Sequence, residues 1–131
     1  MVLDTSAILA ILLEEPEAAQ FVHLIGEDRI RLFSAVSLVE ASIVLRNRKG
    51  EGGEHKLDQF VQRAKVQIMP VDMQQAETTR DAYSKFGKGI HPACLNFGDC
   101  FVYALAKTTK EPLLFKGNDF ALTDVQRVSP D

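Results

Sequence analysis

Short apolar runs alternate along the chain with longer segments in which apolar residues recur every three or four positions. The short runs predict strands at residues 1–3, 31–34, 66–71, 113–115 and 125–128. The amphipathic segments predict helices at residues 6–13, 17–25, 37–49, 54–64, 73–86 and 96–108. This alternation predicts a three-layer α/β/α fold with a mainly parallel central sheet of about five strands.

Capping residues and glycines set the expected limits of several helices. Ser37 and Glu40 have the spacing of a capping box, and Asn96 and Asp99 repeat that spacing with a shorter acid. Asp72 is expected to cap the helix that follows it. The Gly-rich stretch 50–53 predicts a turn between two helices, and residues 87–95 predict a loop. Phe97, Phe101, Ala104, Leu105 and Thr108 share the predicted packing face of the helix 96–108.

The length and composition indicate one domain, residues 1–131. The chain has 131 residues, of which 46% are hydrophobic, enough for one core. No apolar run approaches the roughly 20 residues that span a bilayer, and no signal peptide precedes the first strand, so a cytoplasmic protein is expected. Cys94 and Cys100 are six residues apart, which matches no metal or redox motif and predicts free, half-buried thiols.

Four acids are expected at one edge of this sheet. Asp4 ends the first strand, Glu40 and Asp99 fall in the first turns of predicted helices, and Asp119 follows the strand at 113–115. Ligands of such folds bind at the carboxyl ends of the strands, where the following helices begin. Each acid alone also has a structural interpretation, as a helix cap, a dipole partner or a turn residue.

Taken together, the four acids favour a metal site. None of them has a Lys or Arg as its immediate neighbour in the chain. Two carboxylates about 5 Å apart repel each other by roughly 3 kcal/mol at an effective dielectric near 20, so the cluster must take up protons or hold a cation. Oxygen-only ligands suit Mg²⁺, with Mn²⁺ as a substitute.

The net charge of −3 does not exclude a nucleic-acid partner. If four of the acids are gathered around a cation, the rest of the chain is slightly basic, and Arg46, Arg48 and Lys49 form its densest basic patch. Two interpretations of this patch stay open. It is either the cation-rich last turn of a helix or a contact for phosphates.

Four motifs carry a resemblance to a known family. In chain order they are Asp4-Thr5-Ser6-Ala7, Ser37-x-x-Glu40, Asn96-Phe97-Gly98-Asp99-Cys100 and Lys116-Gly117-Asn118-Asp119-Phe120. Their order and spacing resemble the successive motifs of PIN-domain ribonucleases, specifically the VapC-type toxins of bacterial toxin–antitoxin pairs. The likeness covers nearly the whole chain.

The resemblance implies a role for each motif. Asp4, Glu40, Asp99 and Asp119 would be metal ligands, and the hydroxyl groups of Thr5 or Ser6 would orient metal, water or phosphate. Asn96, Arg46 and Arg48 are the other expected substrate contacts. Family members commonly have an acid where this chain has Asn118, so the share of the fourth position between Asn118 and Asp119 stays open.

The implied function is that of a metal-dependent endoribonuclease and toxin. Such toxins usually form homodimers, and a cognate VapB-type antitoxin inhibits them by inserting a segment that often carries an Arg. A carboxylate cluster is a suitable receptor for a guanidinium group. Hydrolysis by a metal-activated water should leave a 5′-phosphate and a 3′-hydroxyl.

Other classes have weaker signals. A phospho-acceptor or nucleotide-binding α/β module would need a Gly-rich phosphate loop, or a further acid near Asp4 where Thr5 and Ser6 stand. A metal-free ribonuclease would need His, but His23 and His55 fall in helical stretches and His91 in a loop. A plain protein-interaction domain remains as a third alternative.

Overall fold

A computed structural model describes residues 1–129. Its four strands are β1 (Val2–Leu3), β2 (Leu32–Ser34), β3 (Gln67–Met69) and β4 (Leu113–Leu114), which pair in the order β3-β2-β1-β4 with every pairing parallel. The helices are α1 (Thr5–Leu12), α2 (Ala18–Glu27), α3 (Ala35–Lys49), α4 (Glu51–Arg63), α5 (Met73–Phe86) and α6 (Phe97–Thr109). None of these helices is long and apolar enough to cross a membrane.

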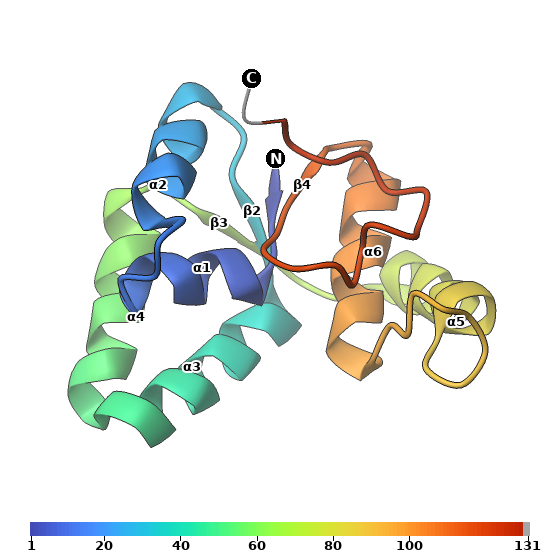
Figure 1. The fold of residues 1–131 in the computed structure, drawn as a ribbon, viewed down its shortest axis with the longest axis horizontal. Coiled ribbons are helices and arrows are strands. Elements are labelled where there is room, and N and C mark those ends of the chain that lie inside the picture. Colours follow the sequence, from blue (N-terminus) through green and yellow to red (C-terminus); the bar gives the residue numbers. More distant parts are fainter. Residues whose placement is uncertain (130–131) are drawn as a thin grey trace.

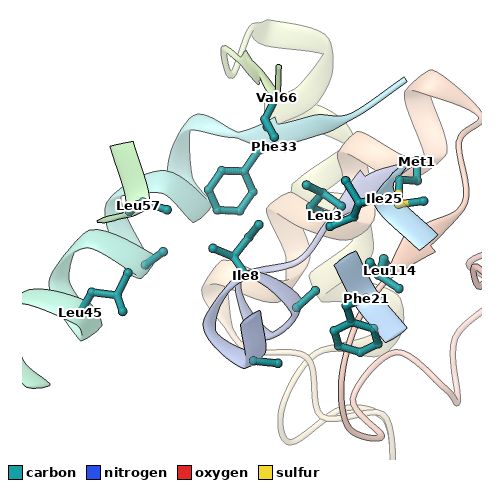
Figure 2. Close-up of a cluster of buried hydrophobic side chains, with 13 residues drawn as sticks. Met1, Leu3, Ile8, Phe21, Ile25, Phe33, Leu45, Leu57, Val66 and Leu114 are labelled. Carbon is teal, nitrogen blue, oxygen red and sulfur yellow. The ribbon is translucent and has the colours of Figure 1, made fainter. Parts of the chain in front are cut away.

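The sheet lies between two groups of helices, as Figure 1 shows. Helices α1 to α4 cover one face, and α5 and α6 cover the other. Successive strand residues point to opposite faces, so Val2 packs with α5 and α6 whereas Leu3 packs with α1 to α4. Figure 2 shows the cluster on the side of α1 to α4, in which Leu3 and Phe33 lie beside Ile8. The predicted three-layer α/β/α fold is confirmed.

The expected fifth strand does not form within the described residues. Residues 125–128 approach β4, but they make only an isolated bridge between Arg127 and Leu113. Two backbone hydrogen bonds hold this contact, from Leu113 N–H to the Gln126 carbonyl and from Val128 N–H to the Leu113 carbonyl. Because β4 is only two residues long, it cannot form a longer ladder of hydrogen bonds with residues 125–128. The sheet therefore has four strands.

The Gly-rich stretch 50–53 forms a sharper turn than the sequence predicts. Gly50, at φ 67°, ends α3, and α4 begins at the next residue. Gly53 is already helical and buried, and a Cβ there would come within 2.7 Å of the Leu45 carbonyl oxygen on α3. The glycines therefore allow two helices to pack closely and do not form an extended loop.

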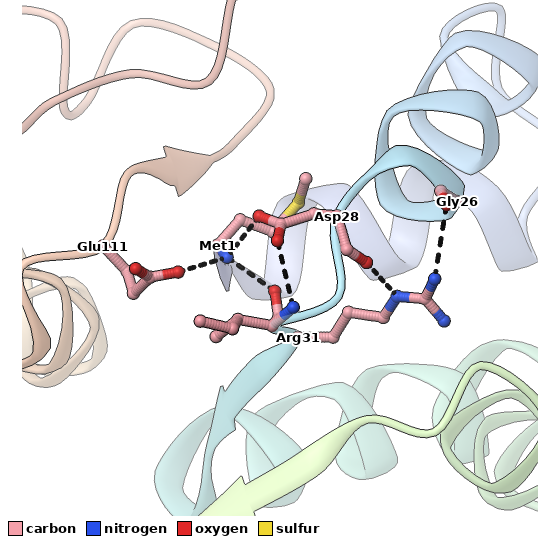
Figure 3. A network of polar contacts seen from close by, with 6 residues as sticks. Met1, Gly26, Asp28, Arg31 and Glu111 are labelled. Atoms are coloured by element: carbon pink, nitrogen blue, oxygen red, sulfur yellow. Dashed lines mark hydrogen bonds and ion pairs between the residues drawn. The ribbon is translucent and has the colours of Figure 1, made fainter.

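Met1 anchors a network at the edge of the sheet where the strands begin. Its amino group lies 2.7 Å from Asp28 Oδ2, 2.8 Å from Glu111 Oε1 and 2.6 Å from the Ile30 carbonyl oxygen (Figure 3). Arg31 extends the network by donating to the Asp28 and Ala64 carbonyls. The two acids at this edge thus have a cation between them.

The two cysteines are free, as predicted, but they are not half-buried. Cys100 lies on the inner face of α6 and is buried, whereas Cys94 is exposed in the loop before α6. Helical spacing places position 100 toward the core, and position 94 belongs to no regular element.

Candidate metal centre

Asp4 joins the end of β1 to the start of α1. Its N–H donates to the Leu114 carbonyl at 3.0 Å, which continues the pairing of β1 with β4. Its side chain then caps α1, because Oδ2 accepts from the Ser6 N–H at 3.0 Å and from the Ser6 hydroxyl at 2.5 Å. The residue is only 7% exposed. A single residue thus ends a strand and caps a helix, with its carboxylate buried at the edge of the sheet.

Glu40 reaches the same edge from α3. Thr5, the first residue of α1, places its hydroxyl 3.5 Å from Glu40 Oε1 and 3.5 Å from the Ser37 carbonyl oxygen. The predicted capping box of Ser37 and Glu40 is wrong. Helix α3 begins earlier, with Ser34 accepting from the Val36 N–H, because β2 runs directly into the helix. Glu40 therefore lies in the second turn.

Ser37 is buried inside α3 and does not act as a cap. Its hydroxyl oxygen has no hydrogen-bond partner within the described part of the chain. Its carbonyl oxygen still serves the site, because Thr5 donates to it.

Asp99 stands in the first turn of α6, as predicted. Its N–H donates to Asn96 Oδ1 at 2.9 Å, and the Asn96 N–H donates to Asp99 Oδ2 at 3.0 Å, so this capping box is confirmed. Asn96 has a structural role as the helix cap. Its expected contact with substrate stays a prediction.

The fourth position lies on the loop after β4. Gly117, at φ 100°, turns the chain there, and Asn118 and Asp119 that follow are both exposed. The charge of Asp119 is felt at Asp99, where it raises the pKa. The carbonyl of Asn118 accepts from the Ala121 N–H. Asp119 therefore belongs electrostatically to the cluster, and the share of Asn118 stays open.

Asp4, Glu40 and Asp99 hold their protons more tightly than usual, because the pKa of each is raised. Burial raises the pKa of Asp4, with a further rise from Glu40, against the lowering effect of Ser6. Burial and the charge of Asp99 raise the pKa of Glu40. Burial raises the pKa of Asp99 to about 6, with Asp4 and Asp119 adding to the rise and the Asn96 N–H opposing it. These acids interact as one cluster of like charge.

Lys116 is a member of the site that the sequence reasoning did not assign. Its N–H donates to the Ser6 hydroxyl at 2.9 Å, and that hydroxyl donates to Asp4. Its ammonium group pairs with Glu15 and Glu17, each at 3.0 Å. Lys116 is the cation nearest to Asp119 in the sequence, but it is paired with acids between α1 and α2 and not with Asp119. The position of Lys116 within the last motif was the only sequence signal for it.

The donor set fits a divalent cation. Within residues 1–129, none of the four acids forms an ion pair with Lys, Arg or His. All their donor atoms are oxygens, which Mg²⁺ and Mn²⁺ prefer. As they stand, no three acidic, His or Cys side chains of the described residues are arranged to hold a metal ion. Asp4 Oδ2, Glu40 Oε1 and Asp99 Oδ2 each accept a hydrogen bond, which leaves acceptor capacity on every carboxylate for a cation.

The basic patch lies at the far end of α3. Arg46, Arg48 and Lys49 occupy its last turn, as one of the two interpretations predicts. Arg46 pairs with Glu54 at 3.1 Å and with Glu51 at 3.9 Å, both on α4. At 1.5 Å per helical residue, the patch begins about 9 Å beyond Glu40 along the helix. Phosphate contact by Arg46 and Arg48 stays a prediction.

Fold and site together define an α/β protein with a carboxylate cluster at the C-terminal edge of a parallel sheet. The chain belongs to the PIN domain family, which residues 1–126 match. Among curated relatives, Ribonuclease VapC of Mycolicibacterium smegmatis is 49% identical over 128 residues, covering 98% of this chain and 99% of that protein. Ribonuclease VapC30 of Mycobacterium tuberculosis is 47% identical over 129 residues, covering 98% of both chains.

Solved structures share the fold at low sequence identity. Mycobacterium tuberculosis VapC20, a Sarcin-Ricin loop cleaving toxin, superposes with a TM-score of 0.80 at 16% identity, covering 98% of each chain. VapBC2 of Rickettsia felis, bound to a DNA fragment from its promoter, superposes with a TM-score of 0.76 at 15% identity, covering 98% of this chain and 96% of that one. The PIN-type, VapC-like architecture predicted from the motifs is confirmed.

Proposed function

We propose that this protein is a metal-dependent endoribonuclease and the toxin of a toxin–antitoxin pair. The observation that carries the proposal is the cluster of Asp4, Glu40 and Asp99, whose pKa values are raised and which form no ion pair with Lys, Arg or His within residues 1–129. The near-full-length similarity to proteins named Ribonuclease VapC supports the reaction and the toxin class. Mg²⁺ is the proposed ion, with Mn²⁺ as its substitute.

Asp4, Glu40, Asp99 and Asp119 would hold the ion. When bound, it would make a water molecule more acidic and stabilise the negative charge that grows on the phosphoryl oxygens. Ser6 holds the Asp4 carboxylate in place through two hydrogen bonds, and Thr5 does the same for Glu40 through one. The chain thus supplies a set of oriented carboxylates, and RNA phosphates are the proposed substrate groups.

The alternative functions find less support at this edge. A phospho-acceptor needs a carboxylate open to a phosphoryl donor, but Asp4 is buried and engaged by Ser6. A metal-free ribonuclease needs His beside the scissile phosphate. His23 interacts with Glu27, His55 with Gln59, and the His91 ring accepts from the Ala93 N–H, so none of these contacts involves one of the four acids.

A VapB-type antitoxin is the proposed inhibitor. The charge of the cluster favours a partner that brings an Arg, because a guanidinium group pairs with two carboxylate oxygens at once. In this proposal the antitoxin supplies the counter-charge that the described residues lack. An antitoxin with its Arg changed to Ala should therefore inhibit less strongly.

A homodimer is the proposed assembly, and an exposed apolar surface beside the site supports it. Val39 and Ile43 on α3 are 56% and 54% exposed, and Phe97 on α6 is 74% exposed. The sequence predicts that Phe97 lies on the packing face of α6. This prediction is wrong, because Phe97 is exposed and does not pack in the core of its own chain. A second copy of the chain would bury these side chains. Ile43→Lys should shift the sedimenting species from dimer to monomer.

The test of the activity is RNA cleavage with and without the ion. Purified protein is incubated with total RNA in Mg²⁺, in chelator, and in chelator followed by excess Mg²⁺, and the new ends are mapped. Cleavage is expected only with the ion, leaving 5′-phosphate and 3′-hydroxyl ends. Cleavage that persists in chelator, or ends that carry a cyclic phosphate, would contradict the proposal.

A further inference from the structure

Gly98 occupies a helical position where glycine is unfavourable. It lies in the first turn of α6, between Phe97 and Asp99, and it is buried. Its φ is not positive, so the backbone does not require glycine there. Alanine has a higher helix propensity than glycine. The presence of glycine therefore calls for a reason outside the helix backbone.

The carboxylate of Glu40 supplies that reason. A Cβ on Gly98 would lie 2.2 Å from Glu40 Oε2, 2.6 Å from its Oε1 and 2.6 Å from its Cδ. The three nearest atoms are thus all from one carboxylate, which rests against the bare backbone of α6. Real side chains do not approach so closely, so a methyl group there would displace the carboxylate.

Other helical glycines of the chain lack this arrangement. Gly26 in α2 and Gly52 in α4 have no atom within 4 Å of a Cβ position. Gly53 is close to the Leu45 carbonyl of α3, which is a backbone packing contact. Among these positions Gly98 is distinguished by its contact with a proposed metal ligand.

We infer that Gly98 is a positioning residue, which sets the place of the Glu40 carboxylate beside Asp99 by leaving room for it on α6. The inference rests on the proposed function, because positioning matters only if Glu40 is a ligand. Thr5 limits the carboxylate from the side of α1, and Gly98 limits it from the side of α6. Glu40 ends in a flexible side chain, so Gly98→Ala should move the carboxylate and leave the fold in place.

The first experiment measures Mn²⁺ binding to the metal-free protein by calorimetry. Gly98→Ala should raise the Kd for Mn²⁺ by about tenfold or more, in the range found for residues that orient metal ligands. Gly52→Ala is the matched control, a helical glycine with open space, and its Kd should equal that of the wild type. In a Glu40→Asp background the loss from Gly98→Ala should be smaller, because the shorter side chain keeps its carboxylate away from the new methyl group.

The second experiment separates this contact from a general packing defect. Thermal unfolding is measured in chelator for the wild type, Gly98→Ala, Glu40→Ala and the double variant. In the Glu40→Ala background, Gly98→Ala should raise the unfolding midpoint, because the obstacle is gone and alanine favours the helix. In the wild-type background the midpoint should rise less or fall. This coupling is readable even where one single variant folds poorly.

Each result has a distinct meaning. A Gly98→Ala protein that binds Mn²⁺ as the wild type does would overturn the inference and leave the proposed function standing. Additive shifts of the unfolding midpoint would also overturn it, since they exclude contact with Glu40. A wild type that takes up no Mn²⁺ would remove the proposed function, and the unfolding cycle would then decide the contact alone.

Discussion

The two edges of the parallel sheet carry acids in opposite circumstances. Where the strands begin, Asp28 and Glu111 lie within 2.8 Å of the Met1 amino group, as Figure 3 shows. Where the strands end, Asp4, Glu40 and Asp99 interact with one another, and no ion pair reaches them within residues 1–129. Both edges bring together residues from distant parts of the chain.

The pKa values follow this difference. Burial works to raise the pKa of Asp28, but hydrogen bonds from the Met1 amino group and the Ile30 N–H outweigh it, and the pKa is lowered. At the other edge burial and like charges raise the pKa of Asp99 to about 6. Charge balance, rather than burial alone, thus separates acids that support the fold from acids that are available to a ligand.

The largest effect is expected from Asp99→Asn. The change removes one charge from the proposed metal site but keeps an oxygen that accepts from the Asn96 N–H. Cleavage of RNA in Mg²⁺ should fall on the order of 1,000-fold in kcat/KM, because loss of a ligand removes several kcal/mol of charge stabilisation. Glu111→Gln at the balanced edge is the control and should keep its activity. If Asp99→Asn cleaves RNA as the wild type does, the acids at the two edges do not differ in their importance for the reaction.

The second effect concerns stability and pH in the absence of metal. The pKa of Asp99 is raised from 3.8 to about 6 in the folded protein, so the folded state binds the extra proton more tightly. The stabilising contribution is complete below about pH 4 and is lost as the pH rises through 6. The unfolding free energy is measured with denaturant in the presence of chelator. The contribution of Asp99 to it should be roughly 2 kcal/mol smaller at pH 7.5 than at pH 4.

Asp99→Asn isolates that contribution. The variant lacks the titrating group, so its unfolding free energy should depend less on pH, and at pH 7.5 the metal-free variant should be more stable than the wild type. A variant that loses stability at pH 7.5 would show that the Asp99 charge supports the fold, as the charge of Asp28 does.

A smaller and opposite effect is expected from Asp28→Asn. Removing the charge weakens two hydrogen bonds, from the Met1 amino group and the Ile30 N–H. Because Asp28 is partly exposed and Glu111 remains as a partner, the loss should be about 1–2 kcal/mol of unfolding free energy. Its pKa is lowered, so this stabilisation is present above pH 3.8 and disappears only as the pH falls below that value. Mn²⁺ binding should not change.

The sequence predicted the layers well, because their cause is local. Alternation in Val2-Leu3 and in Leu32-Phe33 sends successive side chains into the two cores. The caps Asp72 and Asn96 were also found, since each makes its bond within three residues. The fifth strand was wrong, because strand pairing for residues 125–128 depends on how much edge the two-residue β4 offers.

The candidate site was predicted less completely, because several of its contacts join residues that are far apart in the sequence. The acids could be assigned to one edge from their positions after strands and in helix starts. Their charge state could not, because it depends on contacts between distant residues, such as Glu40 with Asp99. Gly98 and Lys116 were missed since their contacts, with Glu40 and with Ser6, cross the chain. Ser34 was passed over as a cap because Ser37 has the better sequence pattern.

The smallest expected effect tests whether cations outside the acidic edge serve its substrate. Arg48 lies in the last turn of α3 and is exposed, and no ion pair of the described residues involves it. If it contacts a phosphate, Arg48→Ala should raise KM for RNA about threefold and lower the dependence of log KM on log salt by about one, with kcat unchanged. Arg63→Ala, in the last turn of α4, removes the same charge from the same kind of helix end. If both variants change equally, the basic patch is only the cation-rich end of a helix. If only Arg48→Ala changes, Arg48 contacts the substrate, and the RNA-binding surface extends from the acids along α3.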